Sequence, residues 1–308
     1  MNTTIVTPPV IPVTPDLAGL EPIEKIRRRW PMLLGAAVSL LMVAGLGYEL
    51  LDQGLAGLSR TAPNSWIFYI FFALFYLGPP TFDYIIFRKL WRIPLSGMVA
   101  LHRKRIANEV VLGYSGEAYF YAWARQRTQM VAAPFGAVKD VSILSAIAGN
   151  GITLAMLAMA LPLATGLLTP AQYNTALISI VAMVAMSLPF LIFSKRVFSL
   201  PRSTLWWVFG VHSVRLIIGS ILVACAWHFA MPDVSIGMWL ILAASRMLVS
   251  RLPFVPNKDL LFANFAIIMI GQGQALSELL AFTAALTLAV HVALIAGFGL
   301  LGLFRKDL

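Results

Sequence analysis

The sequence predicts an all-α fold, a polytopic bundle of transmembrane helices with almost no water-soluble domain. Two features of the composition predict it: 59% of the 308 residues are hydrophobic and only 12% are charged. Soluble domains contain about 45–50% apolar and about 25% charged residues, and a soluble chain with this excess would expose large apolar patches. A third observation is that the apolar residues gather in runs of about 20, the length of a helix that crosses a bilayer.

Residues 1–30 precede the first apolar run and are predicted to form a disordered cytoplasmic tail. Prolines at 8, 9, 12 and 15 stand among Thr and Val, a composition typical of extended chain. The basic run at 25–29 then ends at Trp30, a residue type that is enriched at membrane interfaces. Residues 31–304 are predicted to form a single transmembrane domain.

Apolar runs account for most of this domain. Two further stretches follow the runs of spanning length, at 260–270 and 276–304, and the first of them is short for a full crossing. It is predicted to be a tilted span or a re-entrant half-helix. The chain is therefore predicted to cross the membrane about eight times, or six times with re-entrant hairpins in addition. The runs of spanning length are 32–51, 66–87, 141–163, 173–193, 205–230 and 235–249.

Lys and Arg residues set the predicted orientation. The connection 88–139 carries nine of them, whereas Arg60 is the only one in the connections that alternate with it. The positive-inside rule then places both termini in the cytoplasm, which we expect to be that of a bacterium with this chain in its inner membrane. The net charge of +10 is predicted to face anionic lipid headgroups, and no nucleic-acid-binding module is recognisable.

The polar segment 94–139 is apolar enough in part to enter the membrane, yet Glu109 and Glu117 lie within it. Gly113 and Gly116 favour a break in the helix or the close approach of another backbone. Non-helical backbone survives at membrane depth only when it is buried in protein or lines a wet cavity. We predict a re-entrant hairpin that faces such a cavity; the alternative is an amphipathic helix lying flat on the inner surface.

Charged residues inside the predicted spans are also candidates for a binding site. Arg215 lies about ten residues into the run 205–230, where an ionised side chain costs about 2.5–3.5 kcal/mol, so we expect it to face the bundle interior and to be paired. Arg246 lies in the following span. Asp83 is predicted to lie at an interface, where snorkelling accounts for it.

A second helix break is predicted at Pro253 and Pro256. Lys258 and Asp259 follow it and would present charges at the start of the next helix; an ordinary cytoplasmic turn is the alternative. The candidate substrate-binding residues are Asn108, Glu109, Glu117, Arg125, Asp140, Arg215, Arg246, Lys258 and Asp259. The histidine spacing does not match a metal site, so none is predicted.

These sites resemble motifs of the flippase-like membrane family typified by the transmembrane region of lysylphosphatidylglycerol synthases. Asn108, followed by Gly-Tyr-Ser-Gly-Glu at 113–117, resembles that family's Asn…Pro-x-Arg-x-Gly-Glu segment, and Arg125 matches the basic residue that trails it. Asp140 resembles the Asp of its Glu-Arg-x-x-Asp motif. Leu-Pro-x-x-Pro at 252–256 resembles its Leu-Pro-x-x-Pro-Gly-Gly-Leu-Gly-x-x-Glu motif.

Departures from these motifs indicate a divergent branch. Gly113 stands at the position of the family's Pro, and Ser115 or Tyr114 at that of its Arg. Gly136 and Ala137 replace its Glu-Arg pair, and Asn-Lys at 257–258 replaces its Gly-Gly. No region resembles the soluble lysyl-transferase domain, so aminoacyl transfer is not expected.

The resemblance implies that the chain binds, and translocates, an anionic lipid or lipid-linked headgroup. Two other functions are left open: a membrane-embedded lipid-modifying or glycolipid-synthesis enzyme, and a non-transporting accessory subunit of an envelope-polysaccharide system. No paired-Asp motif, nucleophile–base spacing or Walker-type loop indicates catalysis or a cofactor. The expected partners are anionic membrane lipids and, for the accessory role, envelope-biosynthesis proteins.

Overall fold

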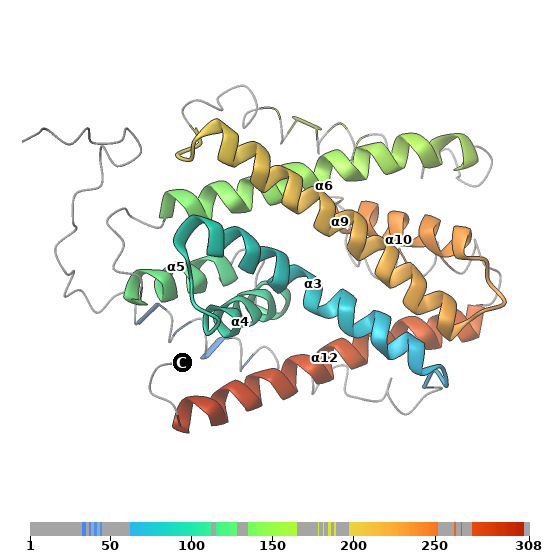
Figure 1. Cartoon of the computed structure of the whole chain (residues 1–308). Helices are drawn as coiled ribbons and strands as arrows, with labels where there is room; N and C mark the ends of the chain where they lie inside the picture. Colours follow the sequence, from blue (N-terminus) through green and yellow to red (C-terminus); the bar gives the residue numbers. More distant parts are fainter. Residues whose placement is uncertain are drawn as a thin grey trace, which may run out of the picture.

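The computed structural model describes residues 62–111, 115–127, 135–164, 197–251 and 273–304, with isolated positions before and between them. Within these ranges the fold is all-α, as predicted, and Figure 1 shows the helices. Their bounds are α3 (Trp66–Trp91), α4 (Gly97–Val110), α5 (Ser115–Arg127), α6 (Phe135–Ala164), α9 (Arg202–Ala230), α10 (Ile236–Arg251) and α12 (Gly273–Phe304).

The long apolar helices coincide with predicted spans. α6 covers the predicted run at 141–163, and α10 contains a shorter apolar stretch, Ile236–Val249. By length and composition, three helices of the described part are able to cross a membrane: Trp66–Trp91, Arg202–Ala230 and Ala275–Leu300. The described part of the chain therefore has several helices with the composition expected of a membrane protein.

Other parts of the predicted topology lie outside the described residues. These include the tail 1–30 and most of the runs at 32–51, 173–193 and 260–270. The number of crossings and the cytoplasmic position of both termini thus stay predictions.

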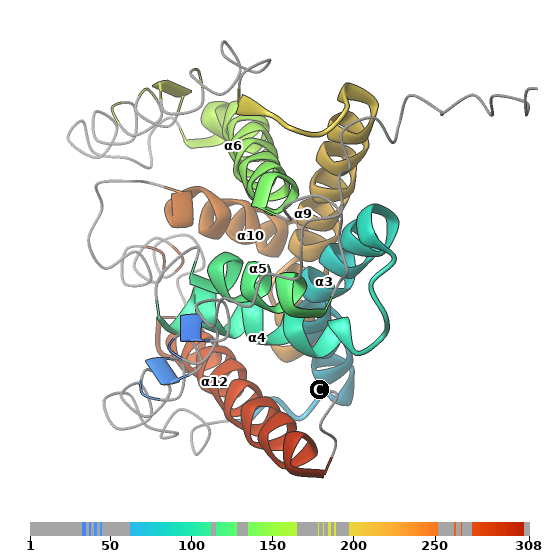
Figure 2. The same cartoon turned by 90° about the vertical axis from the view of Figure 1, so that its left-hand side faces the viewer.

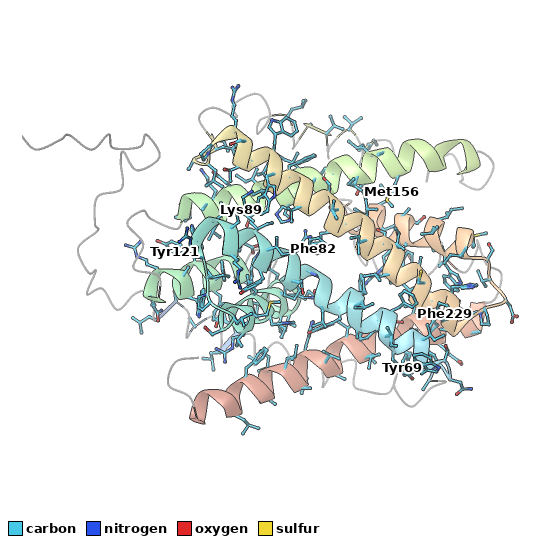
Figure 3. All side chains as sticks on the ribbon, in the orientation of Figure 1. Tyr69, Phe82, Lys89, Tyr121, Met156 and Phe229 are labelled. Atoms are coloured by element: carbon cyan, nitrogen blue, oxygen red, sulfur yellow. The ribbon has the colours of Figure 1, made fainter. Side chains whose placement is uncertain are left out.

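Helices α3 and α9 pack along their length and run in opposite directions (Figure 1). The ring of Phe71 stacks on that of Phe229 with centroids 5.5 Å apart, and the ammonium of Lys89 lies 3.9 Å from the ring centroid of Trp207. Figure 3 shows Tyr69 and Phe229 at one end of this pair and Lys89 toward the other. Residues midway along α3 therefore face residues midway along α9.

Two clusters of buried apolar side chains fill the described bundle. The first apolar cluster surrounds Phe87 and Phe120, with ring centroids 4.5 Å apart, and draws on α3, α4, α5, α6, α9 and α12. The second apolar cluster surrounds Trp227 and Trp239, with centroids 5.7 Å apart, near the start of α3. Because lipid solvates apolar side chains as well as a neighbouring helix does, close packing rather than water exclusion stabilises these clusters within a membrane.

Helices α4 and α5 form an antiparallel hairpin inside the bundle. Figures 1 and 2 show them between α12 on one side and α6 on the other. Ile106 on α4 and Phe120 on α5 are fully buried in the first apolar cluster. The sequence predicted a break between Glu109 and Glu117, and α4 ends at Val110 while α5 begins at Ser115. The hairpin is thus part of the core and differs from the alternative of one helix on the surface; its depth in the membrane stays a prediction.

Candidate functional site

Charged side chains meet in the bundle interior, between the two apolar clusters. The Nζ of Lys104 on α4 lies 2.6 Å from Oδ2 of Asp83 on α3 and 3.4 Å from Oε1 of Glu117 on α5. Nη1 of Arg215 on α9 lies 3.8 Å from Oδ1 of the same Asp83. Asp83 and Lys104 are 6% and 7% exposed, so this is a desolvated network in which two cations share one carboxylate. We call these four residues the charge cluster.

The hairpin places Lys104 and Glu117 beside each other because Gly116 allows the two backbones to touch. A Cβ at Gly116 would lie 1.9 Å from the carbonyl oxygen of Lys104, which no side chain tolerates. The N–H of Gly116 donates to Oδ1 of Asn108 at 2.7 Å, and the hydroxyl of Ser115 donates to the carbonyl of Ala107 at 2.7 Å. The close approach predicted for Gly116 is confirmed.

Ionisation of Lys104 depends on its two acidic neighbours. Burial by itself would lower the pKa of the ammonium. Asp83 and Glu117 outweigh this effect and raise the pKa above its usual value. Lys104 is therefore a charged ammonium in the interior.

Two prolines in α3 explain the position of another cation. Pro80 has no N–H, so the carbonyl of Tyr76 one turn earlier has no partner within the helix. Nη1 of Arg105 on α4 donates to this carbonyl, and the guanidinium carbon lies 4.2 Å from the centroid of the Tyr76 ring. Arg105 thus takes over the hydrogen bond that proline removes, and it ties α4 to α3 about two turns before Asp83.

A cavity of about 1000 Å³ adjoins the charge cluster and is lined by residues of α3, α4, α5, α6, α9 and α10. Among the described residues, three acids and four bases line it, which gives its wall a formal charge of +1. The acids are Asp83, Glu109 and Glu117, and the bases are Lys104, Arg105, Arg215 and Arg246.

The cavity has a charged end and an apolar end. Leu74 on α3 and Val223 on α9 also line it. They lie nine residues before Asp83 and eight after Arg215, or about 12–14 Å away along each helix. Because α3 and α9 are antiparallel, both displacements lead in the same direction. Leu74 is 49% exposed, so the apolar end reaches the surface of the described bundle.

Arg215 has unused hydrogen-bonding capacity. Its Nη2 donates to the hydroxyl of Ser145 on α6 at 2.8 Å, while its Nε has no hydrogen-bond partner among the described residues. His212, one turn earlier on α9, is 1% exposed and lines the same cavity. His212 and Arg215, three residues apart, therefore lie on the same face of α9.

Five predicted site residues are brought together: the cavity lining includes Asn108, Glu109, Glu117, Arg215 and Arg246. Of the other predicted residues, Arg125 and Asp140 are not part of this lining.

Two predicted residues make contacts away from this lining. Nη1 of Arg125 donates to the hydroxyl of Tyr121 at 2.6 Å. Asp140 is fully buried, and its Oδ2 accepts the backbone N–H groups of Ser199 and Leu200 at 2.6 and 2.8 Å.

Asp140 thereby connects the start of α6 to the segment that enters α9. Lys258 and Asp259 lie outside the described residues.

Asp83 is buried in the bundle and paired with Lys104, so snorkelling does not account for it, and its depth in a membrane stays a prediction. The predicted span ended at residue 87, but α3 continues to Trp91, which places Asp83 two turns inside the helix. The partners that make this position tolerable, Lys104 and Arg215, come from helices distant in the sequence. In the sequence, the one signal for this buried position is that Asp83 is a single carboxylate in an apolar run, soon after Pro79 and Pro80.

No metal site emerges from the part of the chain that the structure describes, where no three His, Cys, Asp or Glu side chains are grouped to hold an ion. A scan against protein-family models and searches of curated proteins and solved structures find no match to this chain. The resemblance to the flippase-like family therefore rests on the short motifs given above and stays a prediction.

Proposed function

We propose that this chain is a membrane protein that binds an anionic lipid or lipid-linked headgroup in the cavity beside the charge cluster and translocates it across the bilayer. The observation that carries the proposal is Arg215, a cation whose side chain is only 15% exposed, on a helix apolar enough to span. Among the described residues, the carboxylate oxygen that pairs with it is Oδ1 of Asp83 at 3.8 Å, and this Asp83 is already bonded to Lys104 at 2.6 Å.

A phosphate group suits this arrangement chemically. Buried charges are stable only when they are paired and hydrogen-bonded. Guanidinium offers a planar fork of donors that matches phosphate or carboxylate oxygens. An anion beside Arg215 would complete its hydrogen bonds without displacing the contact between Lys104 and Asp83.

The shape of the cavity favours an amphiphile over a free anion. A headgroup at the charged end places its hydrocarbon chains toward Leu74 and Leu77, which are 49% and 45% exposed and line the cavity. These side chains project from a helix with the composition of a span. A lipid therefore keeps its chains in the bilayer while its headgroup occupies the interior.

Translocation is the part of the proposal that depends on the family resemblance. Lys104 contacts acids on two different helices. A change in these contacts would alter the charged end of the cavity and so release a bound headgroup. A shift of the α4–α5 hairpin relative to α3 exchanges these contacts, a two-state rearrangement of the kind seen in transporters.

The test compares wild-type protein with Arg215→Gln in proteoliposomes that contain fluorescent phosphatidylglycerol. Arg202→Gln is the matched control, because Arg202 is exposed at the start of the same helix. We expect Arg215→Gln to lower the flip rate, and the amount of anionic lipid retained in native mass spectrometry, by at least about tenfold, equivalent to about 1.4 kcal/mol. Equal lipid retention and equal flip rates in both variants and the wild type would contradict the proposal.

A further inference from the structure

The charge cluster is a row of contacts whose two ends differ in chemistry. Its members follow one another through ion pairs in the order Arg215, Asp83, Lys104 and Glu117. At one end, the guanidinium of Arg215 only donates hydrogen bonds. At the other end, the carboxylate of Glu117 only accepts them. We call these the donor end and the acceptor end.

The acceptor end has more hydrogen-bonding capacity than the described residues fill. Among them, Lys104 is the ion-pair partner of Glu117, at 3.4 Å, and Oε2 of Glu117 accepts no hydrogen bond. An ionised carboxylate has about four lone-pair sites. Because the side chain of Glu117 is only 17% exposed, water compensates for little of this deficit. A buried acceptor without a donor is costly, so a ligand that donates to Glu117 would be stabilised.

Asp83, in the middle of the row, has a similar deficit. Its Oδ2 is bonded to Lys104, while its Oδ1 accepts no hydrogen bond from a described residue. Asp83 and Glu117 both line the cavity. Two carboxylates of the cavity wall therefore each have an oxygen that lacks a donor.

A phosphodiester by itself cannot supply these donors. It has no N–H or O–H group, so it can accept from Arg215 but cannot donate to Glu117. The missing donor must come from another part of the headgroup. The described lining has a formal charge of +1, which one phosphodiester neutralises. An ammonium would leave a positive charge unbalanced in the interior, which is costly, whereas a hydroxyl donates without adding charge.

A further side chain of the lining suits a hydroxylated ligand. Ser142 on α6 lines the cavity, and its Oγ has no hydrogen-bond partner among the described residues. A serine hydroxyl both donates and accepts, so it can pair with a second hydroxyl of the same headgroup. The unpartnered groups of the wall thus include a donor for phosphate, acceptors for hydroxyls and a hydroxyl that can act as either.

We propose that the headgroup bound in this cavity is a hydroxylated phosphodiester, a polyol or sugar phosphate, with its phosphate at the donor end and a hydroxyl that donates to Glu117. This rests on the proposed function and adds to it the chemical class of the headgroup. Glu117 is then a specificity-determining residue. It selects hydroxyl-bearing anionic lipids over lipids of equal charge that lack a hydroxyl.

The experiment compares three short-chain lipids of equal net charge, whose binding to the purified full-length chain in detergent is measured by calorimetry at pH 8. Phosphatidylpropanol has the headgroup carbon skeleton of phosphatidylglycerol without its hydroxyls. Phosphatidylserine carries an ammonium together with a second anionic group. We expect phosphatidylglycerol to bind to the wild type at least about tenfold more tightly than either, because a site built to hydrogen-bond a hydroxyl rejects an analogue that lacks it.

Glu117→Leu and Glu117→Gln are a matched pair of variants. Both remove the negative charge, and only glutamine keeps an acceptor oxygen. Glu117→Leu should reduce the preference for phosphatidylglycerol over phosphatidylpropanol to less than about twofold, whereas Glu117→Gln should keep most of it. A merely structural role of Glu117 would change the affinities for both lipids by the same factor and leave their ratio unchanged.

The outcomes separate this proposal from the proposed function. Equal affinity of the wild type for phosphatidylglycerol and phosphatidylpropanol would overturn the hydroxyl assignment and leave the anion site in place. Tighter binding of phosphatidylserine would identify an ammonium as the donor and overturn it as well. A preference that persists in Glu117→Leu would overturn the role of Glu117. Absence of binding of all three lipids would overturn both proposals.

Discussion

Asp83 and Asp140 are two buried carboxylates on long helices, and their surroundings are opposite. Oδ2 of Asp140 accepts two backbone N–H groups, from Ser199 and Leu200, while its Oδ1 lies 3.4 Å from the ammonium of Lys139. Asp83 is shared between cations on two other helices, and its Oδ1 has no hydrogen bond to a described residue. Asp140 thus fixes the segment before α9 to the start of α6, whereas Asp83 borders the cavity.

The comparison shows that burial and charge by themselves do not identify a binding group. Backbone N–H groups are fixed partners whose contacts to Asp140 are made once, when the chain folds. Lysine and arginine side chains can exchange one oxygen ligand for another, so the region of Asp83 can respond to an anion. We therefore expect substitutions in the Asp140 region to affect stability alone, and those in the Asp83 region to affect both stability and binding.

The largest effect is expected from Lys104→Met. This change leaves Asp83 and Glu117 without their shared cation in the interior, and removal of one partner from a buried ion pair costs about 3–5 kcal/mol. The free energy of unfolding measured by denaturing-detergent titration should fall by that amount. Lys89→Met is the control, since Lys89 is exposed and rests on an aromatic ring. A loss no larger than that of the control would show that the charge cluster does not stabilise the fold.

A smaller loss of stability is expected from Asp140→Ala. Two backbone N–H groups lose a charged acceptor, and a hydrogen bond to a charged group contributes about 1.5–3 kcal/mol. Because the segment at 198–201 is partly exposed, other partners can replace part of both bonds, and we place the total loss at about 1.5–3 kcal/mol. The same preparation should bind phosphatidylglycerol with wild-type affinity. A tenfold loss of affinity would instead show that Asp140 contributes to lipid binding, and the two regions would then not differ in function.

The smallest effect is an increase in affinity from Asp83→Asn. Without the negative charge of Asp83, the positive charges of Arg215 and Lys104 are less neutralised, so the cavity becomes more positive. We expect phosphatidylglycerol to bind about tenfold more tightly, or about 1.4 kcal/mol, in calorimetry at pH 8. Unchanged affinity would indicate that the anion does not contact the cations that Asp83 holds.

Several features of the candidate site were predictable from local sequence. Gly116 predicted a close backbone approach, and its neighbour Glu117 was identified as a cavity residue on that basis. The position of Arg215 in the middle of an apolar run predicted a buried, paired cation, since lipid exposure would be too costly. Each of these inferences needs only the residue and its neighbours along the chain.

The sequence by itself determined the all-α fold of the described residues, where their long apolar helices lie, and the interruption between Glu109 and Glu117. Apolar run length and glycine conformational freedom are local properties, so no contact between distant residues had to be known. Only the tertiary structure decided that Asp83, Lys104 and Arg215 meet, that Arg105 replaces the hydrogen bond lost at Pro80, and that Asp140 lies apart. These depend on the register between helices, which close packing sets over many contacts and which the pattern of any one helix does not contain.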